Sequence, residues 1–479
     1  MHKYCFGILF IFFSYINFIS ADEFNFDFLN ADTSAEPVES FKNSEQNNIQ
    51  LNFVIEQTFR FNSKNSKIPK SNIPLDFFYD WNNRITLSSK IKFKITDRIN
   101  LNLYDRLNYI IDDKNNLTSA LVNNDVNELF FNFAIDSLNS FNIGRINMKN
   151  GAAIGFNPTD FLKKYAGNEK VSDDPIVLRE NRLGVLMASY QNINKLGAIS
   201  VAAIPSINTE INKWHTTRGS FPLNLNKTNN LEKYIVKLEL NTFNNVQPEL
   251  LYISEKGQSG FGANISSSIS DNIIIYAEWS GTKKKNILME TILKYCYDYG
   301  ISKDLPETVL PDFIKNKKYK NEISAGFSYT EKKYKRTTYI EYHYNQNGVN
   351  KNYVKYVAES EYYNTIKHYF NQIDLYMPHY YLYWATRDNS NNLMEPYYKK
   401  QLFFRNQWFE AFHKKINLVT MIQYNLIDNS YYSKFILEYN YNNRLIFNSS
   451  AVFYIGDLDS EYGGLPESYN IKAGCSYYF

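Results

Sequence analysis

Charged side chains at alternate positions are the residues of this chain that could most directly do chemistry. Over residues 83–95 the even positions include Arg84, Lys90, Lys92 and Lys94. Because successive side chains of a β-strand point to opposite faces, these cations would share one face. A face of one sign selects ions of the opposite sign. The spacing therefore predicts either a track for anionic solutes or a network in which nearby carboxylates neutralise the cations.

Other alternating segments place further charges on faces of the same kind. The basic candidates are Arg60, Arg106, Lys233, Lys237, Arg405 and Lys434. The acidic candidates are Glu56, Glu128, Glu239, Glu278, Glu341 and Glu438. Both signs occur, so the network interpretation, in which Glu56 and Arg106 complete the lysine ladder, stays open beside the anionic track.

Catalytic motifs are not found in the sequence. It contains no nucleophile elbow, HExxH, paired CxxC or phosphate-binding loop. His343 lies two residues from Glu341, so both would project from one face of a strand, which suits a hydrogen bond as well as a general base. No carboxylate or histidine cluster has metal-ligand spacing. We therefore expect a protein that is not an enzyme and that has no cofactor or metal.

The composition limits the class of protein. Hydrophobic residues make up 44% of the 479 residues and charged residues 21%, which excludes a wholly disordered chain. The net charge of +3 gives no reason to expect nucleic acid as a partner. Aromatic residues reach 17%, and they gather at the ends of the alternating segments, as in the aromatic girdles of membrane barrels.

The elements that would position these charges are β-strands of an unusual length. The alternating segments run for about 10–13 residues, whereas soluble strands average about 5–6 and tilted membrane strands need about 9–11. A soluble sandwich would bury the apolar face, and a membrane barrel would turn it to lipid. The length and the aromatic ends favour an all-β fold, a transmembrane antiparallel up-and-down β-barrel.

We expect 18 strands, with 16 as the alternative count. An even number puts both ends of the barrel in the periplasm, and short periplasmic turns then alternate with long outer loops. The longest loop, residues 347–399, contains a segment at 380–386 that could be a strand. Because one extra strand breaks the parity, we interpret it as loop, either a hairpin above the membrane or a segment folded into the pore. The predicted strands are residues 49–61, 83–95, 99–111, 126–136, 139–148, 182–193, 196–206, 231–241, 246–255, 260–270, 272–281, 320–330, 335–346, 400–412, 416–427, 432–441, 443–455 and 469–479.

The first residues predict export. A short basic start, an uncharged apolar run over residues 4–19 and small residues before Asp22 are typical of a signal peptide spanning residues 1–21. An uncleaved anchor helix is the alternative. Residues 22–48 are acidic and lack alternation, so we expect a periplasmic tail or a partial plug. Residues 49–479 would form the barrel.

The last ten residues carry the most specific motif. Ile471, Ala473, Cys475, Tyr477 and Phe479 alternate with other residues, and Phe479 is the last. This pattern resembles the C-terminal strand of Gram-negative outer-membrane β-barrels. The resemblance implies that Phe479 and Tyr477 form the mark read by the barrel-insertion machinery. It also implies a location in the bacterial outer membrane, with outer-membrane lipid as a partner.

Residues 144–183 resemble the corresponding segment of porin-like outer-membrane proteins. A Gly-Arg strand end is followed by an Asn-Pro-Thr-Asp turn and, later, by basic residues before the next strand. The resemblance implies a loop that enters the barrel and narrows it; a plain turn is the alternative for the Asn-Pro-Thr-Asp motif. The constriction candidates are Arg145, Asn157, Asp160, Arg179 and Arg182.

A barrel of 16 to 18 strands is too wide for its side chains to fill, so it leaves an aqueous passage. We therefore predict an outer-membrane porin-like channel for passive passage of small hydrophilic solutes. One alternative is a surface-exposed binding or adhesion barrel that uses the loops 282–319 and 347–399. Another is a plugged transporter for hydrophobic molecules. No oligomeric state can be read from the sequence.

Overall fold

The computed structural model describes residues 48–68, 79–114, 117–167, 174–207, 225–241, 245–298, 317–349, 378–458 and 460–479. The chain divides into two compact units, one of residues 1–45 with Phe479 and one of residues 46–478. The predicted signal peptide and almost all of the predicted tail or plug lie outside the described residues. The fold and the site below belong to the second unit.

One 18-stranded antiparallel sheet makes up this unit. Its strands are β1 (Ile49–Lys64), β2 (Trp81–Thr96), β3 (Ile99–Lys114), β4 (Leu117–Ala134), β5 (Asn139–Ile146), β6 (Val185–Asn194), β7 (Gly197–Ile204), β8 (Lys233–Leu240), β9 (Val246–Glu255), β10 (Gln258–Ser270), β11 (Ile273–Lys284), β12 (Lys318–Glu331), β13 (Arg336–Asn345), β14 (Lys400–Trp408), β15 (Ile416–Asn425), β16 (Tyr431–Asn440), β17 (Leu445–Ile455) and β18 (Glu467–Tyr478).

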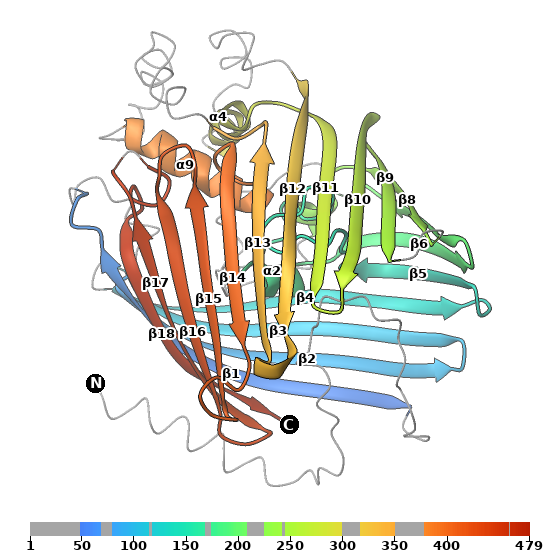
Figure 1. The fold of residues 1–479 in the computed structure, drawn as a ribbon, viewed down its shortest axis with the longest axis horizontal. Helices are drawn as coiled ribbons and strands as arrows, with labels where there is room; N and C mark the ends of the chain where they lie inside the picture. Colours follow the sequence, from blue (N-terminus) through green and yellow to red (C-terminus); the bar gives the residue numbers. More distant parts are fainter. Residues whose placement is uncertain are drawn as a thin grey trace. The chain divides into compact units, whose positions relative to one another are not determined.

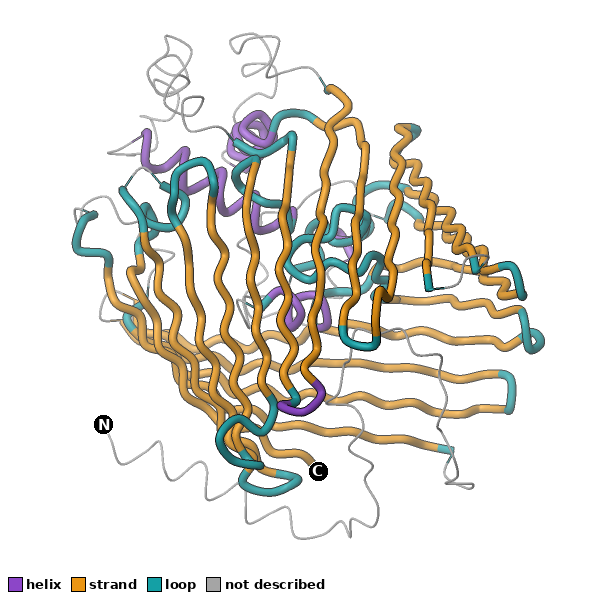
Figure 2. The backbone as a smooth tube through the Cα atoms, in the orientation of Figure 1, coloured by secondary structure: helices purple, strands orange, loops and turns teal. Residues whose placement is uncertain are grey.

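The sheet closes on itself because β1 pairs with both β2 and β18. Ile55 lies opposite Leu87 on one side and opposite Tyr477 on the other. Every other strand pairs with its neighbours in the chain, so the topology is up-and-down (Figures 1 and 2). The predicted fold class and the count of 18 are confirmed, and the alternative count of 16 is wrong.

The two faces of the sheet differ in chemistry, as the alternation requires. Outward side chains are apolar and exposed: Phe59 is 47% exposed and Ile471 49%. Inward side chains between them are polar and covered: Arg60 is 7% exposed and Thr86 2%. An apolar outer belt with a polar interior is the arrangement expected of a barrel in lipid.

The interior is not polar throughout, which the sequence analysis did not predict. On β6 to β9 several inward positions are apolar, for example Val185, Met187, Ile235 and Leu251. These strands are short, 8 to 10 residues. An apolar inner wall requires something to cover it, and a loop provides the cover, as described below.

The structure corrects two of the predicted segments. Residues 117–125, predicted as part of an outer loop, belong to β4, which pairs with β3 almost to the tip of the hairpin and contains a bulge opposite Tyr104 and Asp105. Polar residues on both faces of this stretch hid its alternation. Residues 380–386 belong to the long connection and not to a strand, as predicted, but within it they lie in helix α9 (Pro378–Leu393) and not in a hairpin.

The remaining helices lie in connections between strands. They are α2 (Pro175–Glu180), α3 (Leu225–Thr228), α4 (Ile287–Asp298) and the 3₁₀ helix η4 (Lys332–Tyr334). Figure 1 shows α4 and α9 near one end of the strands and α2 behind β12 and β13. Among the helices of the described ranges, none combines the length and apolar character that a membrane span requires.

Candidate functional site

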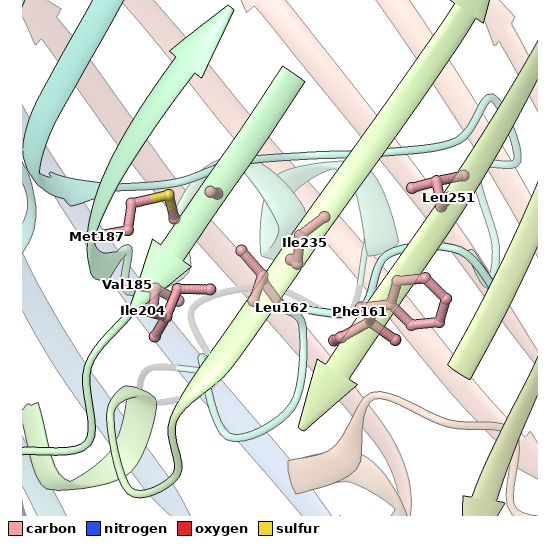
Figure 3. Packing of buried hydrophobic residues seen from close by; sticks show 9 residues of the cluster. Phe161, Leu162, Val185, Met187, Ile204, Ile235 and Leu251 are labelled. Atoms are coloured by element: carbon pink, nitrogen blue, oxygen red, sulfur yellow. The ribbon is translucent and has the colours of Figure 1, made fainter. Parts of the chain in front are cut away.

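The connection between β5 and β6, residues 147–184, folds against the inner wall of the barrel. Phe161 and Leu162 are 8% and 2% exposed, and they pack on the apolar inner faces of β6 to β9 (Figure 3). Burying a side chain of this size contributes about 1.5–3 kcal/mol. The apolar patch of the wall and these two residues therefore hold one side of the loop. We call residues 147–184 the inner loop.

A buried carboxylate on β13 holds the middle of the inner loop. Glu341 Oε1 accepts from the backbone N–H of Ile154 at 2.6 Å, and Oε2 accepts from that of Gly155 at 2.8 Å. Tyr276 Oη on β11 donates to the same Oε1 at 2.6 Å. His343 Nε2 lies 3.0 Å from Oε2. Because Glu341 is 0% exposed, it acts as a fixed anchor for backbone donors.

A second buried carboxylate, Glu278 on β11, also accepts hydrogen bonds from the inner loop. Glu278 Oε1 accepts from the backbone N–H of Ala153 at 2.6 Å, and Oε2 accepts from Thr159 Oγ1 at 3.1 Å. Asn157 Nδ2 lies 3.5 Å from Oε1. Two strands of the wall, β11 and β13, which lie on either side of β12, thus hold residues 153–155 of the Gly-rich turn.

Glycine at position 155 permits this close approach. A Cβ atom there would lie 2.8 Å from Phe403 Cγ and 2.9 Å from His343 Nε2. Any side chain would push the turn off β13 and β14, and the bond from Gly155 N to Glu341 would break. This is a structural reason for the Gly-rich sequence of the segment.

Inside the loop, the predicted constriction residues form an ion-pair network. Arg182 makes a bidentate pair with Asp160, at 2.8 and 3.0 Å, and both side chains are almost fully buried. Arg179 donates to the carbonyl oxygens of Asn150 and Gly151 at 2.7 and 3.0 Å. These arginines therefore stabilise the conformation of the inner loop and also give it positive charge.

The two other constriction candidates also make internal contacts. Arg145 is 3% exposed at the end of β5, and its Nε donates to the carbonyl oxygen of Gly184 at 3.0 Å. The carbonyl oxygen of Asn157 accepts from Lys163 Nζ at 2.7 Å. Burial lowers the pKa of Lys163. The sequence analysis did not select Lys163, because a lysine in a polar loop carries no signal of burial.

Helix α2 closes the inner loop against β14. Asp174 caps its N-terminus by accepting from Ile176 N at 3.0 Å, and its other oxygen lies 3.4 Å from Arg405 Nη2. Ile176 packs against the cluster of Ile154, Phe403 and neighbouring wall residues. Arg405 therefore holds the loop to the wall.

We expect Asp174→Ala to reduce the local stability of α2 by about 1–2 kcal/mol, because the helix loses its cap and Arg405 its carboxylate. Hydrogen exchange of the α2 amides measures this change. Asp174→Asn is the matched control, since asparagine keeps the capping oxygen and removes only the charge. Equal exchange in the alanine variant and the native chain would contradict the capping role.

The predicted inner-wall charges on β1 and β3 are paired. Arg60 donates to Asn62 Oδ1 at 2.7 Å and to Glu467 Oε2 at 2.8 Å. Arg106 lies 3.5 Å from Glu56 across the strands. This geometry matches the network interpretation of the basic residues on these strands. Further predicted residues also lie on the inner face, namely Arg84, Lys434 and Glu438.

The wall of β8 and β9 carries a second group of paired charges. Lys233 Nζ lies 3.3 Å from Glu255. Lys237 Nζ lies 2.5 Å from Glu239 and 3.6 Å from Glu249. On β4, Glu128 Oε1 accepts from Asn147 N at 2.9 Å and so fixes the start of the inner loop.

The lysine ladder of β2 does not act as a unit. Lys90 lies deep in the wall, with Nζ 4.6 Å from the ring centre of Tyr104. Lys92 and Lys94 are exposed near the end of the strand, and Lys94 pairs with Asp97 of the turn at 2.7 Å. The alternation correctly predicted that the three lysines share the inner face. Lys90 is buried, however, because it lies further from the end of the strand than Lys92 and Lys94.

A buried cluster of charges that the sequence did not reveal joins the long outer loops to the wall. Lys284 at the end of β11 pairs with Glu322 of β12 and, at 2.7 Å, with Glu395, which follows α9. Lys163 of the inner loop lies 3.9 Å from Glu322. Although burial opposes ionisation, Lys284 and then Lys164 lower the pKa of Glu395.

Further contacts fix α9 over the inner loop. The backbone N–H of Tyr165 donates to the carbonyl oxygen of Asn392 at 2.8 Å. Asn389 Nδ2 donates to Thr291 Oγ1 of α4 at 3.2 Å. Arg387 donates to the carbonyl oxygen of Glu461. The described parts of both long loops thus turn towards the barrel interior.

A cavity of about 570 Å³ lies between the inner loop, the segment from α9 to β14, and the wall formed by β1 and β15 to β18. Charged and tyrosine side chains share its lining. The lining residues that matter here are Arg60, Arg179, Arg387, Glu461, Glu467, Tyr432 and Tyr454. A space with this lining admits water and small polar solutes.

Glu461, in the connection between β17 and β18, is a buried carboxylate at the edge of this cavity. Gln401 Nε2 and Asn425 Nδ2 each donate to its Oε2 at 2.9 Å. Burial raises the pKa of Glu461 to about 7; the nearby Arg387 lowers it and Asp428 raises it further.

The raised pKa predicts a stability that depends on pH. The folded chain binds the proton of Glu461 more tightly than the unfolded chain, whose carboxyl has the ordinary value near 4.5. The contribution of Glu461 to the free energy of unfolding is fully present below about pH 4.5, and it is lost as the pH rises through about 7. The total contribution is about 3 kcal/mol. Urea unfolding at pH 5.5 and pH 8 measures it. We expect Glu461→Gln to reduce the difference between the two pH values, and an unchanged difference in that variant would contradict the assignment.

Glu341 and His343, the pair that the sequence offered as a general base, are buried where Glu341 binds the inner loop, and neither lies at an open surface. Glu341 and His343 are adjacent, as their spacing predicted, and Ser324 Oγ lies 3.0 Å from His343 Nδ1. All three side chains are at most 1% exposed. The donors from Ile154 and Gly155 already occupy the carboxylate. The arrangement therefore serves as a hydrogen-bond network. Within the described ranges, no group of His, Cys, Asp or Glu has the arrangement of a metal site.

Comparisons with known proteins give a likeness of fold. No protein-family model matches the chain, and no curated protein matches it. The Pseudomonas aeruginosa OccK5 (OpdH) structure is 6% identical, with a TM-score of 0.47, over 90% of this chain and 98% of that one. Acinetobacter baumannii OccAB2 is 10% identical, with a TM-score of 0.47, over 91% and 99%. A triple mutant of the Rhodopseudomonas blastica porin is 9% identical, with a TM-score of 0.39, over 90% and 100%.

The identities and scores are too low to transfer a substrate or a residue role to this chain. The class of the protein follows from its own geometry. A closed 18-stranded sheet with an apolar outer belt and an inner loop folded against its wall is a porin-like transmembrane β-barrel of the outer-membrane type. The resemblance inferred from the sequence is confirmed at the level of the fold.

Proposed function

We propose that this protein is an outer-membrane channel for passive passage of small hydrophilic solutes. The observation that carries the proposal is the inner loop, tied to Glu278 and Glu341 on one side of the interior, beside a polar cavity of about 570 Å³. A loop held in this way narrows a barrel that would otherwise be wide. Passive passage of a solute requires no chemical reaction.

The charges of the wall support a preference for anions. On the arc from β14 to β3, basic side chains predominate on the inner face, while Glu278 and Glu341 are covered by the inner loop. The basic residues of the arc are Arg405, Lys434, Lys472, Arg60, Arg84, Lys90 and Arg106. Carboxylates such as Glu56 and Glu467 pair with some of them, so the preference should be modest.

The outer-membrane location and the export route belong to the same proposal. Tyr477 lies on β18 opposite Ile55, where the strand closes the barrel. With Phe479 it supports recognition by the insertion machinery. Surface binding through the loops 282–319 and 347–399 has less support, because α4 and α9 are bound to the interior.

Solute entry into vesicles tests the proposal. The refolded chain is placed in liposomes that are then diluted into neutral, anionic or cationic solutes of matched size. We expect swelling that falls with solute size and is fastest for the anions. Entry no faster than in protein-free vesicles, with the barrel shown to be folded by circular dichroism, would overturn the proposal.

A further inference from the structure

Basic side chains gather at one end of the barrel, in the turns that join β12 to β13, β14 to β15 and β16 to β17. Figure 1 shows these turns at the lower ends of their strands. They carry seven basic and two acidic residues, whereas the whole chain has a net charge of only +3. We call residues 331–336, 409–415 and 441–444 the basic turns. Their basic residues are Lys332, Lys333, Lys335, Arg336, Lys414, Lys415 and Arg444.

The other short turns at this end have a different balance of charge. Together they hold two basic and three acidic residues in the part of the chain that the structure describes. These turns are residues 96–98, 135–138, 195–196 and 271–272. Among the described turns, the excess of positive charge therefore belongs to one arc of the rim, from β12 to β17.

Contacts between the basic turns join them into one strip. The backbone N–H of Phe409 donates to the carbonyl oxygen of Lys335 at 2.9 Å, and that of Asn440 donates to the carbonyl oxygen of Lys415 at 2.8 Å. Lys415 Nζ also donates to the carbonyl oxygen of Tyr441 at 2.7 Å. A ligand at this rim therefore meets several cations at once.

Few of these cations are neutralised by a carboxylate. Lys335 Nζ lies 2.6 Å from Glu410, and Lys332 Nζ lies 4.0 Å from Asp271 of the next turn. The other five basic residues form no ion pair within the described ranges, and all of them except the half-buried Lys415 are exposed. Because like charges repel one another, the strip favours a ligand that brings negative charge.

Aromatic rings lie beside the basic turns. Phe412 is 81% exposed with φ 58°, and its ring centre lies 4.9 Å from that of Trp408. Tyr334 and Tyr441 are 50% and 54% exposed, and Lys415 Nζ lies 5.6 Å from the ring centre of Tyr441. Exposed aromatic residues at the ends of barrel strands lie at the boundary between acyl chains and headgroups. The cations next to them are therefore at the level of the lipid phosphates.

Arg336 lies at this level on the lipid side of the sheet. Tyr339 and Glu341 of the same strand are buried on the inner face, so the alternation turns Arg336 outward. It lies opposite Trp408 of β14. A guanidinium can donate to two oxygens of one phosphate, which a single ammonium group does less well.

We propose that the basic turns bind the phosphate groups of anionic phospholipids in the membrane leaflet at this end of the barrel. The inference takes the barrel to lie in the outer membrane, with these turns on the periplasmic side. The phosphate of a zwitterionic lipid is neutralised by the ammonium group of the same lipid, so unpaired cations prefer a headgroup with net negative charge. The acyl chains of the bound lipid lie against the rings of Trp408 and Phe412.

Native mass spectrometry of the refolded chain in detergent tests the site. The two lipids are phosphatidylglycerol and phosphatidylethanolamine with identical acyl chains, added at the same concentration. We expect the native chain to bind severalfold more phosphatidylglycerol. The two lipids should bind equally to the quadruple variant Lys333→Gln, Arg336→Gln, Lys414→Gln and Arg444→Gln. The number of bound lipids does not depend on passage of a solute, so this result is independent of the channel function.

A matched quadruple variant separates a local site from the overall charge. It carries Lys256→Gln, Lys283→Gln, Lys318→Gln and Lys400→Gln, which remove four exposed lysines at the opposite end of the strands. This variant should keep the native preference for phosphatidylglycerol. A native chain that binds both lipids equally would overturn the proposal, and so would a preference that falls by the same factor in both quadruple variants.

Glycerol phosphate separates a lipid site from a site for soluble phosphates, because it has the phosphate and lacks the acyl chains. At the same concentration as the lipid, we expect it to leave the amount of bound phosphatidylglycerol unchanged. Displacement of the lipid by glycerol phosphate would overturn the assignment to phospholipid.

Discussion

Glu341→Ala should release the inner loop from β13 and open the channel. The change leaves the backbone donors of Ile154 and Gly155 and the hydroxyl of Tyr276 without their common acceptor. Removing a buried charged acceptor of this kind costs about 3–5 kcal/mol. We expect the free energy for opening the loop to fall by that amount and the conductance to rise.

Hydrogen exchange at the amides of residues 153–155 measures the opening directly. Glu341→Gln should have a smaller effect, because one carbonyl oxygen still accepts. The control is Glu410→Ala, in an exposed turn where the carboxylate lies 2.6 Å from Lys335 and touches no loop backbone. Native protection of residues 153–155 in Glu341→Ala would show that the carboxylate does not hold the loop.

Lys284→Met should have a comparably large effect on the outer loops. The lysine separates Glu322 and Glu395, whose side chains are 4% and 1% exposed, so its loss leaves two carboxylates buried together. The expected cost is again about 3–5 kcal/mol. Heat or urea unfolding gives the total loss, and hydrogen exchange near residue 395 shows whether the segment after α9 detaches first.

The neighbouring lysine gives a matched control for this prediction. Lys283 is exposed and outward, so Lys283→Met should be nearly neutral. In the double variant Lys284→Met with Glu395→Gln, the loss should be smaller than the sum of the two single losses, because one of the unpaired charges is also removed. Additive losses would mean that Lys284 and Glu395 do not form one cluster.

The sequence predicted the wall of the barrel well because alternation with a period of two is local. Phe59, Arg60 and Phe61 already show which side faces lipid, and the strand boundaries follow to within a few residues in most cases. The prediction failed at residues 117–125, where both faces have similar chemistry. Residues 117–125 mix polar and apolar side chains on both faces, so this stretch does not show the contrast that alternation needs. On β6 to β9 the strands were predicted, but the apolar patch on their inner face was not.

The inner loop was predicted only in part. Its ionic residues Asp160 and Arg182 were selected, but their pairing with each other was not predicted, since an ion pair across 22 residues leaves no periodic trace. The anchors on the wall were identified as inward charges, and their role of accepting from backbone N–H groups depends on where the loop runs. The cluster around Lys284 depends on contacts between segments about 110 residues apart and lies beyond any local pattern.

Single-channel recording tests the central claim most directly. The refolded chain is inserted into a planar bilayer, and the current and the reversal potential are measured under a salt gradient. The account predicts steady single openings, a reversal potential of the sign expected for a modest anion preference, and a larger conductance for Glu341→Ala. A folded barrel that carries no current, in the native chain and in the variant alike, would contradict the channel function.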